Sequence, residues 1–111
     1  MIGLFALLAV SAPPAITCTV ASFYGVGDGF HGRTTASGEV FDAYDLTAAH
    51  KTLPFGTELT VFSTHTGNEV KVRINDRGPY VEGRGLDLSY AAFKKIENPS
   101  VGVAKVCYTT N

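Results

Sequence analysis

The stretch Val72-Arg73-Ile74-Asn75-Asp76-Arg77-Gly78-Pro79-Tyr80 begins as a β-strand and ends as a turn. Apolar and charged side chains alternate at first, as they do on a strand with one buried face. Asn and Asp then favour a bend, Gly permits a positive φ, and Pro cannot donate to a sheet. The next segment, Gly85-Leu86-Asp87-Leu88-Ser89, supplies a second carboxylate. We call residues 75–89 the hook, and we predict that it directs its polar side chains into a cleft.

Length and composition fit one small domain with a modest core. The chain has 111 residues, a formal net charge of −1, 12 glycines and no tryptophan. A charge near zero without Lys/Arg clusters argues against a nucleic-acid partner. The abundance of Val, Thr, Tyr and Phe together with Gly favours β structure with many turns.

The first residues predict an export signal. Residues 1–10 are apolar and are followed by Ser11-Ala12-Pro13-Pro14-Ala15. Such a run is too short to span a bilayer but suits the core of a signal peptide. A buried N-terminal strand is the alternative. We take residues 1–17 as the leader and 18–111 as the domain, which we expect to be periplasmic or secreted without a stable membrane span.

The chain has two cysteines, Cys18 and Cys107, at opposite ends of the expected domain. In an oxidising compartment they can form a disulfide that closes a long loop, which is worth about 4–5 kcal/mol in the chain-entropy model. A lipid-modified Cys18 is the alternative. Neither CxxC nor His-x-x-x-His spacing is present, so we expect no zinc site and no other metal.

Apolar periodicity and turn residues locate the remaining elements. Residues 64–68 predict a hairpin turn, and Asp45 is placed to cap a helix. Asp87 or Ser89 stands near the start of a second helix. The predicted strands are 19–24, 57–62, 69–74 and 101–108, and the predicted short helices are 46–51 and 89–96.

A short internal repeat bears on the architecture. The pattern of residues 45–49 (DLTAA) recurs as residues 87–91 (DLSYA). In both copies a turn with proline, a glycine and a strand follow. Two such copies in a short chain predict a barrel with a pseudo-twofold axis, closed so that no long strand edge is exposed.

With these segments identified, the chain resembles the rare-lipoprotein-A family of bacterial cell-wall proteins. The resemblance covers residues 19 to about 106 without an evident gap. The matching stretches are 21–25 (ASFYG), 30–42 (FHGRTTASGEVFD), 46–54 (LTAAHKTLP), 72–80 (VRINDRGPY) and 86–92 (LDLSYAA).

This resemblance implies a double-psi β-barrel, here a mainly β fold with six strands and two short helices. Family members include lytic transglycosylases that cleave septal peptidoglycan. The fold is shared with expansins and with β-glucanases whose catalytic acid lies in a motif similar to residues 86–89. Longer members carry a peptidoglycan-binding repeat module that we do not find here, and membrane anchoring is not carried over.

Four residues are candidates for the chemistry of glycan cleavage, which needs an acid to protonate the leaving oxygen. Asp76 is a cleft carboxylate or, alternatively, a turn residue bonded to backbone N–H groups or to Arg77. Asp87 is the acid or only a helix cap. Glu39 is matched by the resemblance but could be an ordinary exposed glutamate. His50 is a general base or a hydrogen-bonded rim residue.

Aromatic and cationic side chains near the glycines are candidates for substrate binding. The rings could stack on sugars or belong to the core. The guanidinium groups could bind substrate carboxylates or bridge acids within the hook. The aromatic candidates are Tyr24, Phe30, Phe41 and Tyr80, and the cationic ones are Arg33, Arg77 and Arg84.

The first functional hypothesis is an endolytic peptidoglycan lytic transglycosylase that cuts between N-acetylmuramic acid and N-acetylglucosamine and leaves anhydro-muramyl ends. The second is a non-catalytic module that binds glycan or loosens the wall, similar to expansins. Hydrolysis is a third and needs a second carboxylate to activate water. The expected partner is peptidoglycan or a related β-1,4 glycan. We expect a monomer without a cofactor.

Overall fold

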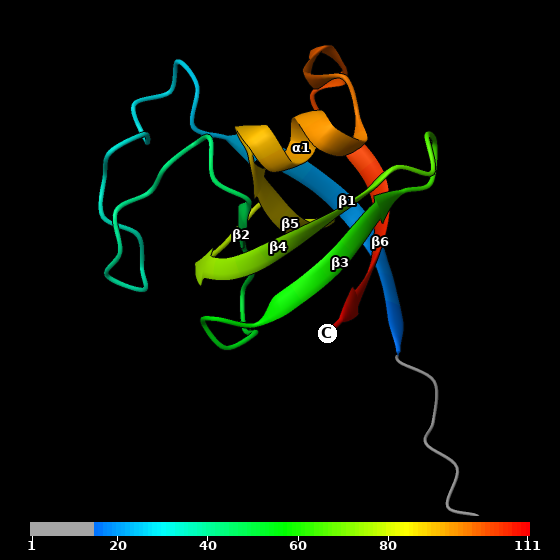
Figure 1. Cartoon of the computed structure of the whole chain (residues 1–111), viewed down its shortest axis with the longest axis horizontal. Coiled ribbons are helices and arrows are strands. Elements are labelled where there is room, and N and C mark those ends of the chain that lie inside the picture. The colour runs from blue at the N-terminus through cyan, green and yellow to red at the C-terminus, as the bar shows by residue number, and fades with distance from the viewer. Residues whose placement is uncertain (1–14) are drawn as a thin grey trace, which may run out of the picture.

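The computed structural model describes residues 15–111 and shows a closed six-stranded barrel (Figure 1). Residues 1–14, which carry most of the predicted leader, lie outside the described residues. The barrel order is β1-β5-β2-β4-β3-β6. The strands are β1 (Ile16–Tyr24), β2 (Thr47–Ala49), β3 (Glu58–Ser63), β4 (Glu69–Asp76), β5 (Arg84–Ser89) and β6 (Ala104–Thr110). A helix, α1 (Tyr90–Ile96), and a 3-10 turn, η2 (Pro99–Val101), separate β5 from β6.

The strand pairing contains the predicted pseudo-twofold axis. Exchanging β1 with β4, β2 with β5 and β3 with β6 reproduces the same set of neighbours. The parallel pair β1–β5 thus corresponds to the parallel pair β4–β2, and antiparallel β1–β6 corresponds to β4–β3. The repeat in sequence includes β2 in its first copy and the junction of β5 with α1 in its second.

The helix predicted over residues 46–51 is wrong, because this segment forms strand β2. Its three residues are all buried, and they pair with β4 on one side and β5 on the other. Small side chains suit this interior position, where pairing to two neighbours outweighs local helix propensity. Asp45 consequently caps no helix.

Asp87 does not cap the second helix, because it lies within strand β5. The N-cap is Ser89, whose Oγ accepts a hydrogen bond of 3.2 Å from the backbone N–H of Ala92. The helix predicted over residues 89–96 is therefore confirmed with Ser89 as its cap, and the Asp87 carboxyl is not occupied by capping.

The core fills the barrel and includes the inner face of α1. Val70, Val72 and Ile74 lie on the buried face of β4, as their alternation predicts. Helix α1 lies across one end of the barrel in Figure 1, and Phe93 and Ile96 on its inner face are fully buried. Within residues 15–111, no helix has the length and apolar character needed to cross a bilayer.

The middle of the hook, residues 77–83, leaves the barrel where β4 ends at Asp76. Gly78 has a φ of +116°, as predicted from the turn residues, and the Gly78–Pro79 peptide is cis. The chain then returns to the barrel as β5. Residues 77–83 therefore connect the ends of two strands that are both neighbours of β2.

A disulfide joins Cys18 to Cys107 across β1 and β6, which confirms the predicted pairing. The bond occupies the Cys18 sulfur that a lipid thioether would need. It links residues separated by 89 positions and is consistent with an oxidising compartment.

Replacing both Cys18 and Cys107 with alanine is expected to lower the free energy of unfolding by about 4–5 kcal/mol, because the unfolded chain loses a long covalent loop. Urea unfolding of the oxidised protein and the double variant measures this difference. Reductant should destabilise the wild-type protein and leave the variant unchanged. A difference below about 1 kcal/mol would contradict this account.

Candidate active site

A cleft of about 320 Å³ lies beside the hook and contains both carboxylates predicted there. Strands β1, β2, β4 and β5 contribute to its wall, and the rest comes from residues 77–81 of the hook and from Phe30 on the loop after β1. The predicted site residues that line it are Tyr24, Phe30, Asp76, Arg77, Tyr80, Arg84 and Asp87.

Strand register places the two carboxylates in one row across this wall. Ala49 of β2 pairs with Asp76 of β4 on one side and with Asp87 of β5 on the other. Asp87 also pairs with Ser22 of β1. The acids are therefore two strand spacings apart, about 9–10 Å between Cα atoms. The small alanine between them leaves open space above the sheet.

Asp87 has the environment of a general acid. The Ser22 hydroxyl donates a hydrogen bond of 3.1 Å to its Oδ1. Burial raises the pKa of Asp87 to about 6, and the negative charges of Asp28 and Asp76 act in the same direction. The Ser22 hydrogen bond and the charge of Arg84 oppose this rise. A carboxyl group with a pKa near 6 is substantially protonated in mildly acidic solution.

Asp76 has a different environment, because three donors fix its carboxylate. Oδ1 accepts hydrogen bonds from the backbone N–H groups of Ala36, at 3.0 Å, and Arg77, at 2.9 Å. Oδ2 accepts one of 3.2 Å from the Tyr24 hydroxyl. The backbone contacts predicted for a turn aspartate are thus present, but they hold a carboxylate that also lines the cleft.

Tyr24 is held rigidly beside Asp76. Its ring stacks on Phe41 with 4.4 Å between centroids. The next residue, Gly25, has a φ of +117°, and a Cβ there would lie 2.7 Å from the Phe41 ring, so the close packing requires glycine. Burial and then the charge of Asp76 raise the pKa of Tyr24 far above its ordinary value. The hydroxyl therefore keeps its proton and donates to Asp76.

Two aromatic rings are exposed at the mouth of the cleft. Phe30 is 48% exposed and packs its edge against Tyr24 at 5.8 Å, and Tyr80 on the hook is 78% exposed. Phe41 is buried behind them and belongs to the core. Exposed rings flanking a polar cleft suit the stacking of sugar faces.

Arg77 lines the cleft but also fixes the loop after β2. Its Nη1 donates to the carbonyl oxygens of His50, at 3.2 Å, and Leu53, at 2.8 Å. Its guanidinium lies 3.9 Å from the centroid of the Phe55 ring. Arg33 is exposed on the loop after β1, outside the cleft lining, whereas Arg84 lines the cleft.

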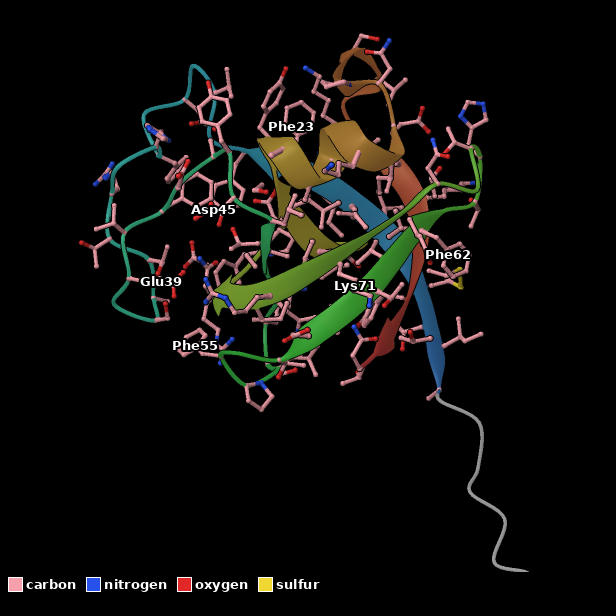
Figure 2. The ribbon with its side chains drawn as sticks, viewed as in Figure 1. Phe23, Glu39, Asp45, Phe55, Phe62 and Lys71 are labelled. Carbon is pink, nitrogen blue, oxygen red and sulfur yellow. A yellow bond between two sulfur atoms is a disulfide. The ribbon has the colours of Figure 1, made fainter. Side chains whose placement is uncertain are left out.

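Glu39 lies outside the cleft lining, on the loop beside the end of β4 (Figure 2). Its two oxygens accept hydrogen bonds of 2.8 and 2.9 Å from Arg73, and Oε1 also accepts one of 2.7 Å from Asn75. The Arg73 hydrogen bonds, followed by the one from Asn75, lower the pKa of Glu39. This carboxylate is therefore a fixed acceptor.

His50 also lies outside the cleft lining. Its Nδ1 accepts hydrogen bonds of 3.0 Å from the backbone N–H groups of both Thr52 and Leu53, so Nε2 carries the proton of the neutral ring and donates to the Tyr108 hydroxyl at 3.2 Å. Burial and then the charge of Arg77 lower the pKa of His50. The backbone N–H of His50 bonds the carbonyl oxygen of Asp76 at 3.2 Å, which ties the loop to the site.

Ser22 and Ala49 are site residues to which the sequence alone assigned no role. Ser22 stands two positions before Tyr24 in one strand, so the two side chains share a face. That alternation was readable from the sequence. The adjacency of β1 to β5 was not, because it depends on the order of strands in the barrel.

Replacing Ser22 with alanine is expected to raise the pKa of Asp87 further, by about 0.5–1 unit, because the ionised carboxylate loses a donor. The ¹³C chemical shift of the Asp87 carboxyl, followed by NMR against pH, reports the change. Ser22→Thr keeps the hydroxyl and should titrate close to the wild-type protein. An unchanged titration in Ser22→Ala would show that the hydrogen bond has no influence.

Comparison with known proteins agrees with this geometry. The family model described as lytic transglycolase matches residues 16–108. The probable endolytic peptidoglycan transglycosylase RlpA of Nostoc sp. is 54% identical over 87 residues, which cover 78% of this chain and 24% of that protein. Endolytic peptidoglycan transglycosylase RlpA of Vibrio cholerae is 50% identical over 86 residues, 78% of this chain and 32% of that protein. The chain therefore spans about a quarter to a third of the length of these curated relatives.

Solved structures share the barrel. A mutant Clavibacter michiganensis expansin in complex with cellohexaose superposes with a TM-score of 0.70 at 23% identity, covering 87% of this chain and 50% of that one. The Streptomyces papain inhibitor gives a TM-score of 0.69 at 22% identity, covering 90% and 98%. Likeness at this identity shows a common fold. Since the family model matches nearly the whole described barrel and the relatives are about half identical over it, the chain belongs to the lytic transglycolase family, as an RlpA-like double-psi β-barrel.

Proposed function

We propose that this domain is a peptidoglycan lytic transglycosylase that cuts the bond between N-acetylmuramic acid and N-acetylglucosamine. The observation that carries the proposal is the partly buried carboxyl of Asp87, whose pKa is raised to about 6. It lines an open cleft, and Ala49 separates it from Asp76. The relatives named peptidoglycan transglycosylases support the choice of substrate.

In the proposed reaction Asp87 serves as both acid and base. It donates its proton to the glycosidic oxygen as the bond from that oxygen to muramyl C1 breaks. The C6 hydroxyl of the same muramyl residue attacks C1 and returns a proton to Asp87. One C–O bond breaks and another forms, giving a 1,6-anhydro end. The acid is regenerated and no water is consumed, so a second carboxylate to activate water is not required.

Asp76 is assigned to stabilise the positive charge that develops at C1 and the ring oxygen. Three donors to its carboxylate fix its position, and two further residues, Glu39 and His50, support the segment around it. Glu39 accepts hydrogen bonds from Arg73 and Asn75, which precede Asp76 on β4. His50 donates its backbone N–H to the carbonyl oxygen of Asp76. We therefore assign Glu39 and His50 to positioning the site and, through it, the substrate.

The cleft mouth provides the contacts to sugars. Phe30 and Tyr80 are exposed rings on which pyranose faces can stack, and Arg84 is a charged lining residue available to a lactyl or peptide carboxylate. The disulfide and the wall-acting relatives support a location in the periplasm or outside the cell. The expected leader, residues 1–17, overlaps the start of β1 at Ile16, so we place the end of the export leader before that strand.

The products of digestion test the proposal. Intact sacculi incubated with the protein in H₂¹⁸O should yield new anhydro-muramyl ends without ¹⁸O, detected by mass spectrometry. The Asp87→Asn variant is the control for contaminating enzymes. Reducing ends carrying ¹⁸O would indicate hydrolysis. Absence of new ends, with protein still bound to the sacculi, would favour the non-catalytic wall-binding module.

A further inference from the structure

The loop that follows β1, residues 25–30 (GVGDGF), carries an aspartate at its centre. The loop begins directly after Tyr24 and ends at Phe30, and both of these residues line the cleft (Figure 1). The glycines on either side of the aspartate have positive φ, and nothing lies within 4 Å of the place where their Cβ atoms would be. Glycine loses more conformational freedom on folding than any other residue. A loop of this composition therefore needs a specific contact to hold it in one conformation.

The side chain of Asp28 supplies that contact. Its Oδ2 accepts a hydrogen bond of 2.7 Å from the backbone N–H of Gly25, and its Oδ1 accepts one of 3.1 Å from the backbone N–H of Phe30. In the part of the chain that the structure describes, these are the only hydrogen bonds that backbone N–H groups of residues 25–30 donate. One carboxylate therefore ties the two ends of the loop together.

Both ends of this loop are attached to the site. At the first end, Gly25 lies against the Phe41 ring, on which Tyr24 stacks. At the second end, the Phe30 ring packs edge-on against Tyr24 with 5.8 Å between centroids. The carbonyl oxygen of Phe30 accepts a hydrogen bond of 3.0 Å from the N–H of Arg33, so a turn fixes the chain after the ring. The chain before the ring depends on the two hydrogen bonds to the loop carboxylate.

The same carboxylate places a negative charge near the proposed acid. Burial is the largest cause of the raised pKa of Asp87, and the charges of Asp28 and Asp76 add to it. The groups that oppose the rise are the Ser22 hydroxyl on β1 and the Arg84 guanidinium on β5. The charged side chains that line the cleft are Asp76, Arg77, Arg84 and Asp87. Asp28 is exposed and is not part of this lining, so it acts on the cleft from outside.

We propose that Asp28 is a positioning residue of the active site, whose carboxylate closes the loop after β1, holds the Phe30 ring at the cleft mouth and fixes a negative charge near Asp87. The proposal rests on the proposed function, because Phe30 and Asp87 are the groups assigned to the sugar face and to the leaving oxygen. Asp28 touches neither and acts through both. Its charge keeps more of Asp87 in the protonated form that the reaction needs.

The place of the Phe30 ring is the first readout, and NMR of the free protein measures it without turnover. Asp28→Ala loses both hydrogen bonds, so the NOEs between the rings of Phe30 and Tyr24 should fall by more than half. Asp28→Asn keeps one acceptor oxygen and should lose less of their intensity. Unchanged NOEs in Asp28→Ala would overturn the proposal.

The titration of Asp87 is the second readout, and a purely structural role of Asp28 would not move it. Asp28→Asn should lower the pKa of Asp87 by about 0.2–0.5 unit, because a like charge is removed. The ¹³C shift of the Asp87 carboxyl against pH measures this change. Asp42→Asn is the matched control, since Asp42 also accepts a hydrogen bond from the N–H two residues on, at 2.9 Å from Tyr44. No change in Asp28→Asn, or an equal change in Asp42→Asn, would overturn the proposal.

Steady-state kinetics on soluble glycan strands gives the third readout. Asp28→Ala and Phe30→Ala should each raise KM about 3- to 10-fold, because the sugar loses its ring. The double variant should raise KM little more than Phe30→Ala alone, since Asp28 acts on KM through that ring. KM effects that multiply in the double variant would show that the two residues act independently, and would contradict the proposal.

The proposed function fails in a different way, namely if the wild-type protein forms no anhydro-muramyl ends on sacculi. The NOEs and the titration of Asp87 belong to the free protein, so they decide the role of Asp28 in either case. For a non-catalytic wall-binding module, the 3- to 10-fold effects of Asp28→Ala and Phe30→Ala should appear in co-sedimentation with sacculi. Equal binding of the wild type and both variants would contradict the role of the loop.

Discussion

Replacing Asp87 with asparagine is expected to lower the rate of glycan cleavage about 10²- to 10⁴-fold, the range typical of a lost general acid–base group. Asparagine has nearly the same shape and can still accept the 3.1 Å hydrogen bond from Ser22. It cannot donate a proton to the glycosidic oxygen. The measurement is the initial rate of anhydro-muramyl end formation, by mass spectrometry, with wild-type and variant protein on the same sacculi.

Protein stability provides the control for Asp87→Asn, because the variant should be more stable than the wild type at alkaline pH. Burial raises the pKa of Asp87 from 3.8 to about 6, so the folded state is penalised when this group is ionised. The penalty is absent below about pH 4 and complete above pH 6. Removing the charge should therefore stabilise the fold by up to about 3 kcal/mol at pH 8 and by little at pH 4. Urea unfolding at the two pH values tests this sign.

The pH dependence of the wild-type cleavage rate should report the titration of Asp87. Asp87 must be protonated to act as an acid, so kcat/KM is expected to fall above an apparent pKa of about 6. If Asp87→Asn retained more than about a tenth of the wild-type activity, or if the alkaline fall persisted in its residual activity, another group would be the acid.

Replacing Asp76 with asparagine is expected to slow cleavage about 10²- to 10³-fold with little change in KM, because the lost charge acts mainly in the transition state. The substitution preserves geometry. The amide oxygen can accept from the N–H groups of Ala36 and Arg77, and the amide nitrogen can donate to a reoriented Tyr24 hydroxyl. Steady-state kinetics on soluble glycan strands separates kcat from KM.

Tyr24→Phe is the matched control for Asp76→Asn. It removes one donor to the carboxylate and leaves the charge, so its effect should be smaller, about 3- to 10-fold. The pH profile offers a second check. The charge of Asp76 helps to raise the pKa of Asp87. In Asp76→Asn the decrease of kcat/KM with rising pH should therefore begin at lower pH. If the decrease of kcat/KM moved to higher pH instead, the charge of Asp76 would not be raising the pKa of Asp87.

Much of the fold was predictable because local signals and global fold agree. The alternation in β4, the bend at Asp76 and the positive φ of Gly78 all follow from residue type, and the structure shows each of them. The pairing of Cys18 with Cys107 was also predicted, and Ser89 was one of the two residues considered for the cap of α1. The strand, bend and cap depend on residues that are close in sequence. The disulfide pairs the two cysteines that the chain contains.

The features that the sequence missed depend on long-range pairing. Residues 46–51 have the composition of a helix, and only the order of strands makes Thr47–Ala49 the strand between β4 and β5. The same order decides that Asp87 faces the cleft, next to Ser22, and caps nothing. Glu39 was chosen by resemblance, and its bonds to Arg73 and Asn75 cannot be read from spacing.

The disulfide also determines how the domain responds to mechanical force. Strands β1 and β6 are antiparallel, with Ile16 opposite Thr109 and Thr17 opposite Tyr108, so the outer ends of the two strands lie side by side. Tension applied through them would separate the strands one residue pair at a time. The next pair is Cys18 with Cys107, where a covalent bond takes up the load. Strand β1 can therefore peel away from β6 by only two residue pairs before the disulfide stops it, and the residues that line the cleft stay paired.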